Sequence, residues 1–272
     1  MLKRKAKPVV VEAESEEESG GGLMEVVSTV LWALGIAVVL RTFLFQPFTI
    51  PSASMYPGLV EGDYIITSKY SVGYGKHAAE PLPFPDVEGR LLGRGPERGD
   101  VIVFRPEGVN YNFIKRVVGL PGDRMQMIDG VLHINGAAAE LEQLGTEPYV
   151  HISEGIVRGT ETADVIRETL TPGDDPHIIY NTANNDTGDN TSVLTVPAGH
   201  YFFMGDNRDH SGDSRYPVQG GRLGIIGTGY VPAENIIGRA EFILLSVDQD
   251  FRLFNPLSWG NMRGSRFFKR IK

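Results

Sequence analysis

A long apolar segment lies near the start of the chain. No charged residue occurs from Val26 to Leu40, and Phe43-Leu44-Phe45 extends the apolar run beyond Arg41. At about 1.5 Å per helical residue, a helix from Val26 to Phe45 is long enough to cross a hydrocarbon layer of about 30 Å. Arg41 lies near one end, where its long side chain can reach the membrane interface. The pattern predicts a transmembrane helix over residues 23–45.

The apolar pattern after residue 45 is of a different kind. Short segments of alternating or β-rich apolar residues are separated by turn signals, and none has a long helical period. Asp129-Gly130 joins two of them, which predicts a hairpin with a type I′ turn. The sequence therefore predicts a mainly β fold, built of antiparallel strands, after the helix. The predicted strands are Tyr64–Thr67, Val101–Phe104, Phe113–Val118, Met125–Ile128, Val131–Ile134, Tyr201–Met204, Gly224–Tyr230 and Ile237–Val247.

A polar region interrupts this pattern. Residues 129–197 are rich in Glu, Asp, Asn, Thr and Gly, and Asn181–Ser192 is almost entirely polar. We interpret the region as a second β-subdomain inserted between two segments of a core, with Asn181–Ser192 as an exposed loop. The predicted organisation is an acidic tail (1–22), the transmembrane helix (23–45), the first core segment (46–128), the inserted β-subdomain (129–197), the second core segment (198–250) and a basic, aromatic tail (251–272).

The basic residues around the apolar segment predict its orientation. Four Lys or Arg residues lie between Lys3 and Lys7, whereas no Lys or Arg occurs between Thr42 and Ser68. Because positively charged flanks stay in the cytoplasm, the N-terminus is predicted inside and the rest of the chain outside. Acidic residues in the tail contribute little to orientation, so they do not reverse this prediction.

A cleavable secretory signal is the alternative interpretation of the apolar segment. A basic start, an apolar stretch and the small triplet Ser52-Ala53-Ser54 all fit such a signal. The apolar run, however, exceeds the usual length of about 7–15 residues, and a signal's small triplet normally follows that run directly. Here Pro47 and Pro51 intervene. The pattern therefore favours an uncleaved anchor.

Composition and charge narrow the classes of function. Of the 272 residues, 41% are hydrophobic and 22% are charged, which is typical of a globular protein. The net charge of -8 argues against a nucleic-acid partner, because phosphate neutralisation needs clustered Lys and Arg. With no cysteine in the chain, disulfides, thiolate nucleophiles and cysteine-bound zinc are excluded.

The last segment of the chain is basic and aromatic. After Asp250 it contains six Lys or Arg residues and no acidic residue. A segment of this composition is suited to the surface of an anionic bilayer. A frayed basic tail is the alternative. The residues concerned are Arg252, Arg263, Arg266, Lys269, Arg270 and Lys272, interleaved with Phe254, Leu257, Trp259, Phe267 and Phe268.

Two segments contain residue types suited to nucleophilic catalysis. The prolines of segment 51–57 bracket Ser52 and Ser54, which makes a rigid segment able to present a hydroxyl beside a backbone N–H. Ser- and Pro-rich loops are common, so this segment alone is weak evidence. A serine also needs a base. On a strand, Lys115 shares one face with two apolar residues while Arg116 points to the other face.

Apolar surroundings are what a lysine base requires. Desolvation disfavours the ammonium ion, so apolar neighbours lower the pKa of Lys115 and allow it to accept a proton near neutrality. The alternative is a lysine that reaches solvent from an edge strand, which is the commoner situation for a single lysine.

A dense polar segment, Gly205–Arg215, follows the predicted strand Tyr201–Met204 and indicates a buried hydrogen-bond network. A calcium loop is disfavoured, because Ser214 and Gly220 stand where such a loop has its glycine and its bidentate glutamate. A Ser–His–Asp triad through His210 is a second alternative, although no Gly-x-Ser-x-Gly elbow is present. A metal site formed by His210 and aspartates is the third.

Taken together, these segments resemble the type I signal peptidases. The resemblance rests on Pro-Ser-x-Ser-Met-x-Pro (51–57), Gly-Asp (62–63), Gly-Asp-Val-Ile-Val-Phe (99–104), Lys-Arg-x-x-Gly-x-Pro-Gly-Asp (115–123) and Gly-Asp-Asn-Arg-Asp-x-Ser-x-Asp-Ser-Arg (205–215). The five motifs follow an N-terminal span in this order and cover essentially the whole chain. The resemblance implies a β-rich catalytic core, of the kind shared with LexA-like autoproteases, with a second β-subdomain.

The resemblance also implies roles for single residues. Ser54 would attack the scissile carbonyl and neutral Lys115 would take its proton. The hydroxyl of Ser52 and the backbone N–H of Ser54 would form the oxyanion hole. Ser211 matches a serine that orients the lysine. The supporting ion pair would be Asp213 with Arg215, and the residues expected to line or shape the substrate pockets are Ile50, Met55, Leu59 and Ile114.

By this resemblance the chain is expected to be a serine endopeptidase that releases exported preproteins from their signal peptides. It would cross the plasma (inner) membrane once, with its catalytic domain on the outer, periplasmic face. The expected partners are preproteins with small residues before the cut, and membrane lipids; no nucleic acid, metal or other cofactor is expected. The alternatives are a Ser–Lys peptidase with a narrow client, of the pilin-processing or self-cleaving type, and a noncatalytic membrane-anchored β-domain.

Overall fold

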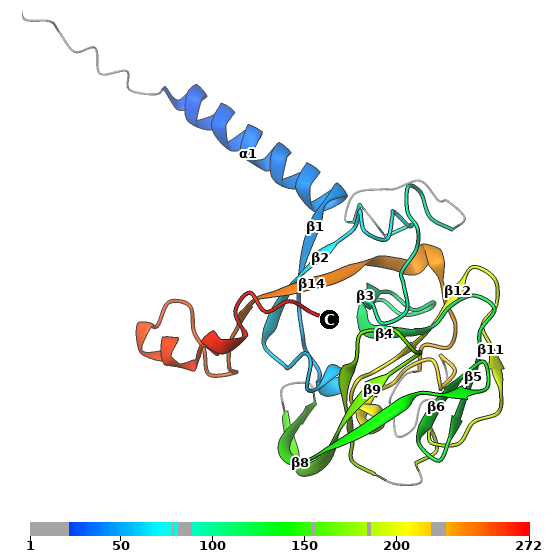
Figure 1. Cartoon of the computed structure of the whole chain (residues 1–272). Coiled ribbons are helices and arrows are strands. Elements are labelled where there is room, and N and C mark those ends of the chain that lie inside the picture. Colours follow the sequence, from blue (N-terminus) through cyan, green and yellow to red (C-terminus); the bar gives the residue numbers. More distant parts are fainter. Residues whose placement is uncertain (1–21, 78, 81–88, 154–155, 184–185, 219–226) are drawn as a thin grey trace, which may run out of the picture. The chain divides into compact units, whose positions relative to one another are not determined.

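The fold consists of an N-terminal helix and a β-rich remainder (Figure 1). A computed structural model describes residues 22–272, apart from residue 78 and the ranges 81–88, 154–155, 184–185 and 219–226. The chain divides into two units, Met1–Val38 and Val39–Lys272.

Helix α1 (Leu23–Phe43) is apolar all round. Its mean hydropathy is 2.2 over an 18-residue window, and its side chains are exposed on every face apart from Thr42. A helix with no polar face has no stable arrangement in water alone, so this one fits a membrane anchor. The helix ends at Phe43, and the predicted last residue of the span, Phe45, instead begins the first strand.

The largest sheet has seven strands in the order β1-β2-β14-β3-β4-β12-β13, and its neighbours pair antiparallel. Strand β14, near the end of the chain, lies between β2 and β3 and has several register shifts. The strands are β1 (Phe45–Thr49), β2 (Asp63–Ser68), β3 (Val101–Phe104), β4 (Phe113–Gly119), β12 (His200–Met204), β13 (Val231–Pro232) and β14 (Ile236–Ser246).

The chain between β4 and β12 forms two smaller sheets. One has the order β11-β5-β6-β7, and the other, β10-β9-β8, is dominated by a long hairpin. The first of these sheets starts at Arg124, five residues before the predicted start of the insertion at residue 129. The strands are β5 (Arg124–Ile128), β6 (Val131–Ile134), β7 (Ala137–Ala138), β8 (Glu140–Ser153), β9 (Ile156–Thr169), β10 (His177–Asn181) and β11 (Leu194–Thr195).

Strand β4 is buried on both faces. Ile114 packs in one core cluster with Ile50 and Met55, whereas Val117 packs in another with residues of β3 and β12. The polar side chains between them, Lys115 and Arg116, are therefore also buried. Short 3-10 helices lie between strands, as η1 (Ala53–Met55), η2 (Arg208–His210) and η4 (Ala233–Asn235) do, or after the last strand, as η5 (Pro256–Asn261) and η6 (Gly264–Arg266) do.

The mainly antiparallel β fold is confirmed, with one exception among the predicted strands. Residues 227–230 of the predicted strand Gly224–Tyr230 are not in a strand, and residues 224–226 lie outside the described residues. The predicted hairpin at Asp129-Gly130 is present, and its two residues have φ of 49° and 78°, as a type I′ turn requires. The pattern missed β1, β8, β9 and β10, and also the two-residue strands β7, β11 and β13.

Candidate active site

Ser54 lies in the short helix η1, between β1 and β2, and its side chain is buried. The neighbouring Met55 is 1% exposed and belongs to the same core cluster as Ile50 and Leu59. Burial of Met55 fixes the turn, so the position of the Ser54 hydroxyl is set by packing on the residue that follows it. The structure brings Lys115 to this hydroxyl, with its Nζ 2.5 Å from Ser54 Oγ.

Lys115 is held by β4, where it pairs with Ile102 of β3, and it is 3% exposed. Its Nζ lies 5.7 Å from the centre of the Phe113 ring, which confirms that the two side chains share a face. Burial lowers the pKa of Lys115 from 10.5 to about 8, against the opposing effect of the Asp213 and Asp206 carboxylates. At pH 8 about half of such a lysine is neutral, compared with about 0.3% at the ordinary pKa.

Ser52 precedes η1 in an extended conformation, and its Oγ lies 3.4 Å from the Oγ of Ser54. The two serines predicted to act together are therefore adjacent at one site. Ser52 is partly exposed, whereas Ser54 is buried. A substrate carbonyl could thus approach from the side on which Ser52 is accessible.

The polar segment Gly205–Arg215, here called the polar loop, packs directly against η1. The backbone N–H of Asn207 donates to the Ser54 carbonyl at 3.1 Å, and its side-chain amide donates to Ala53 O at 3.1 Å. A β-carbon on Gly205 would lie 2.5 Å from Ser54 O and 2.3 Å from the Oγ of Ser211. Only glycine permits this close approach of the loop to the serine.

Asp213 and Arg215 form a buried ion pair within the polar loop. Arg215 donates from Nε to Oδ1 and from Nη2 to Oδ2 of Asp213, each at 2.9 Å. Burial alone would raise the pKa of Asp213, but Arg215 and the hydrogen bonds to the carboxylate together lower it. The carboxylate also accepts the Gly205 N–H at 3.1 Å. The predicted pair is therefore present, and it is charged.

Two further residues of the polar loop are placed differently from each other. Ser211 is buried beside Gly205, but within the described residues its hydroxyl makes no hydrogen bond to Lys115. His210 Nε2 lies 2.8 Å from a carboxylate oxygen of Glu161 on β9. None of the contacts described for His210 reaches Ser54, so the geometry gives no support to a triad.

The four residues expected at the substrate pockets share one core cluster. Each is buried, with an exposed fraction of 8% or less. Alternation along β4 places Ile114 and Lys115 on opposite sides, yet both lie against η1, because that strand is enclosed on both faces. No bulge between Ile114 and Lys115 is involved, because the register shift in the pairing of β4 with β12 lies near Val118. The residues are Ile50, Met55, Leu59 and Ile114.

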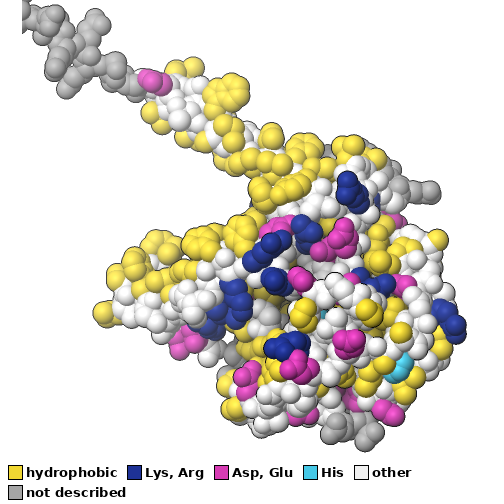
Figure 2. Space-filling model, in the orientation of Figure 1, with side chains coloured by type: hydrophobic (Ala, Val, Ile, Leu, Met, Phe, Trp, Pro, Cys, Tyr) yellow, Lys and Arg dark blue, Asp and Glu magenta, His cyan; other side chains and the backbone are white. Residues whose placement is uncertain are grey.

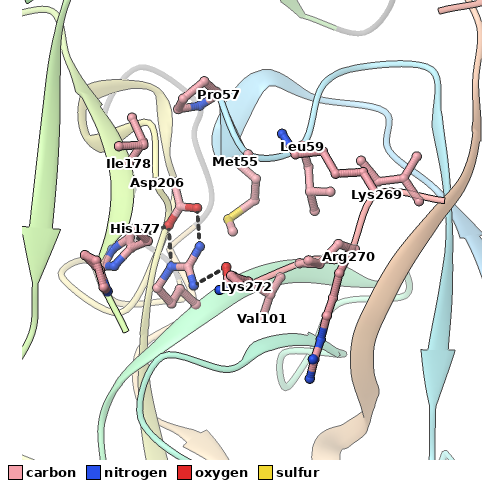
Figure 3. Close-up of a pocket in the computed structure, with 15 residues that line it drawn as sticks. Met55, Pro57, Leu59, Val101, His177, Ile178, Asp206, Lys269, Arg270 and Lys272 are labelled. Atoms are coloured by element: carbon pink, nitrogen blue, oxygen red, sulfur yellow. Dashed lines mark hydrogen bonds and ion pairs between the residues drawn. The ribbon is translucent and has the colours of Figure 1, made fainter. Parts of the chain in front are cut away.

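Sequence reasoning missed a buried ion pair next to the site. Arg116 points away from Lys115 as expected, but it forms a bidentate pair with Asp206, at 2.8 and 2.6 Å. Both side chains line a cavity of about 290 Å³ behind Met55, together with His177 and the last residues of the chain (Figure 3). Arg116 also donates to Lys272 O at 2.9 Å. The only signal in the sequence was that Arg116 directly follows Lys115 in one motif and that Asp206 directly follows Gly205 in another.

Two of the basic residues expected at a bilayer face inward instead. Arg266 binds the buried Asp63 carboxylate with Nε and Nη2, at 3.0 and 2.6 Å. Arg263 donates to Glu61 O at 2.8 Å. These hydrogen bonds fasten the end of the chain to Glu61 and to Asp63, at the start of β2.

Metal ligation has no support in the described residues, where no group of three or more His, Asp or Glu side chains is placed to hold an ion. The geometry instead combines a buried hydroxyl, a lysine with a lowered pKa and a charged supporting pair. This combination can activate a serine.

Comparison with known proteins identifies the family. Residues 23–245 match the family described as signal peptidase, peptidase S26. The chain belongs to this family. Signal peptidase I of Rickettsia typhi is 39% identical over 254 residues, covering 87% of this chain and 89% of the relative. That of Rickettsia felis is 40% identical over 233 residues, covering 81% and 80%.

Among solved structures, a signal peptidase I from Enterococcus faecalis is similar, with 24% identity and a TM-score of 0.28 over 54% of this chain and 97% of the other. Family membership makes the chain a peptidase that processes signal peptides. It removes the alternative of a noncatalytic β-domain, and the apolar helix α1 fits the anchor of such an enzyme.

Proposed function

We propose that Ser54 is the nucleophile and neutral Lys115 the general base of this signal peptidase. The observation that carries the proposal is the 2.5 Å separation of Lys115 Nζ and Ser54 Oγ in a buried site. A lysine with a pKa of about 8 can take a proton from the serine hydroxyl without a histidine.

The proposed reaction has two halves. Lys115 takes the proton as Ser54 Oγ attacks the carbonyl carbon, and the resulting oxyanion is stabilised by the Ser52 hydroxyl and the Ser54 N–H. The ammonium then protonates the leaving amine as the peptide C–N bond breaks. In the second half, Lys115, neutral again, takes a proton from a water molecule as the water oxygen attacks the acyl carbon. The bond between that carbon and Ser54 Oγ then breaks, and the ammonium returns the proton to Oγ.

The proposed substrates are preproteins with a small residue directly before the cut. In this proposal the substrate pockets beside the nucleophile are shallow and are bounded by Ile50, Ile114, Met55 and Leu59, which belong to one buried core cluster. Steric exclusion from such pockets rejects large side chains, so Ala or Gly is expected before the cut. The proposed orientation, from the basic flank before α1, puts the N-terminus in the cytoplasm and the catalytic domain on the periplasmic face.

A cleavage assay tests this function. The full-length chain in detergent is expected to convert a preprotein into a mature protein whose new N-terminus, read by sequencing, follows a small residue. Ser54→Ala should abolish conversion, and Leu or Phe placed before the cut should reduce it by a factor of about 100 or more. Conversion by Ser54→Ala at the wild-type rate would overturn the assignment of the nucleophile.

A further inference from the structure

Two buried titratable residues of the sheet β10-β9-β8 have no role in the mechanism described above. Glu168, on β9, is 0% exposed, and His177, on β10, is 7% exposed. Both belong to a sheet that no catalytic motif enters. A buried carboxylate is costly unless it is paired, so its partners indicate why the fold retains it.

The partner of Glu168 lies on the polar loop. Arg208, in η2, donates from Nη2 to Glu168 Oε2, and both side chains are buried. His177 Nε2 lies 3.1 Å from the same carboxylate oxygen and 4.0 Å from Asp206 Oδ1. Burial alone would raise the pKa of Glu168, but Arg208 and His177 lower it to about 2. The carboxylate is therefore charged at any working pH.

A continuous set of contacts leads from this carboxylate to the base. The backbone carbonyl of Arg208 accepts a hydrogen bond from Arg215 Nη2, and Arg215 in turn holds both oxygens of Asp213. Asp213 is the carboxylate with the largest electrostatic effect on Lys115. Movement of Arg208 would therefore be passed on to the charge that faces the lysine.

A second route connects the same sheet to the nucleophile. His177 lies beside Asp206 (Figure 3), and the Asp206 carboxylate accepts two hydrogen bonds from Arg116. Backbone contacts reinforce this route, because Tyr180 N–H donates to Asp206 O at 2.8 Å. The residue after Asp206 is Asn207, which binds the Ser54 carbonyl. The sheet thus contacts Arg208, the first residue of η2, and Asp206, which lies just before that helix.

We propose that Glu168 is a positioning residue for the Ser54–Lys115 pair, acting through Arg208. This inference depends on the function proposed above. It assigns a role to the sheet β10-β9-β8: its Glu168 carboxylate binds Arg208 and so holds the polar loop in position. The role differs from general stabilisation, because it predicts a change in the chemical step at unchanged substrate binding.

The test compares Glu168→Gln with Glu142→Gln in the full-length chain in detergent. Glu142, on β8, also pairs with an arginine, Arg167, but that pair is exposed, with 61% of the Glu142 side chain accessible. For Glu168→Gln we expect kcat to fall about tenfold or more while KM stays within about twofold. Glu142→Gln should match wild type. Rates are compared below the unfolding temperature of every variant, so that loss of folded protein does not contribute.

A double-mutant cycle identifies the path. In an Arg208→Met background, Glu168→Gln should lower kcat by less than about twofold further, because its partner is already gone. Glu168→Asp, which keeps the charge, should retain more kcat than Glu168→Gln, and it replaces that variant if the glutamine form does not fold. Wild-type kcat in Glu168→Gln, or full additivity in the cycle, would overturn the inference. An inactive wild-type chain would instead count against the proposed function itself.

Discussion

Lys115 and Arg116 are adjacent in the chain and are both buried, yet their surroundings give them opposite chemistry. Arg116 donates two hydrogen bonds to the oxygens of Asp206 and forms a bidentate ion pair with it. Lys115 meets the hydroxyl of Ser54 and the face of Phe113, and burial lowers its pKa to about 8. The two side chains differ in chemistry because they lie on opposite faces of β4 and contact different partners, Ser54 and Asp206.

The rate of cleavage should follow the titration of Lys115. A base acts in its neutral form, so the rate should rise as pH increases through about 8 and continue to rise where a histidine base would already have reached its plateau. Lys115→Arg should be inactive, because a guanidinium cannot give up its proton in this range. Initial rates from pH 6 to 10 measure both effects.

His210→Ala serves as the comparison for this profile. Because His210 pairs with Glu161, this variant should keep most of the activity and the same profile. An active Lys115→Arg, or an inactive His210→Ala combined with a wild-type profile that levels off near pH 6.5, would favour a histidine base instead.

At the scale of elements, the sheet β10-β9-β8 and the polar loop meet through several charged side chains. Tyr149 and Tyr180 pack with Tyr56, and the same sheet carries the buried groups Glu168 and His177. Charged interfaces of this kind respond to pH, since a proton taken up by the unfolded chain and not by the folded one destabilises the fold.

Acid should therefore weaken this protein in two stages. Burial, and then Arg116, lower the pKa of His177 below 6.5, although Glu168 and Asp206 oppose them. The contribution of neutral His177 to the stability of the fold is fully present above pH 6.5. It declines below pH 6.5, because the unfolded chain then binds a proton that the folded chain does not. Glu168 adds a second decline below about 4.5, toward its folded pKa of about 2.

Thermal unfolding of the full chain in detergent, followed by circular dichroism from pH 7.5 down to about 2, measures both stages. His177→Gln should lose less stability than wild type between pH 7 and 5, whereas His200→Gln on β12 should follow wild type. Equal pH dependence in wild type and His177→Gln would show that His177 does not contribute.

At the scale of the molecule, the end of the chain divides into inward-facing and outward-facing residues. Arg263 and Arg266 bind the loop after Ser54, whereas Phe254 and Leu257 are 97% and 94% exposed. Figure 2 shows apolar side chains gathered along one edge of this segment, which is orange to red in Figure 1. Side chains so exposed are suited to a lipid surface.

This surface should bind anionic lipid without the helix. A fragment of residues 44–272 is expected to sediment with anionic vesicles, to bind neutral vesicles less, and to be released by salt. Phe254→Ser should weaken the binding. Leu92→Ser, at an 88% exposed position elsewhere, should not. Equal binding to anionic and neutral vesicles would leave the segment as a basic tail without a lipid role.

The sequence by itself determined the elements whose pattern is local. The apolar helix, the strands with alternating or apolar runs and the Asp129-Gly130 turn all follow from side chains within a few residues of one another. It missed β8 and β9, because a largely exposed ribbon rich in Glu, Asp and Thr has no apolar period. The motif residues Ser54, Lys115 and Asp213 were selected by resemblance, while their proximity was not visible in the chain.

Only the tertiary structure decided which of these residues meet. Ser54 and Lys115 are 61 positions apart and touch because η1 and β4 pack against one core cluster. The partners of Arg116 and Arg208 come from segments between about 40 and 156 positions away. Periodicity reports the face on which a residue lies but not the partner on that face, because the partner is set by how strands distant in sequence pair.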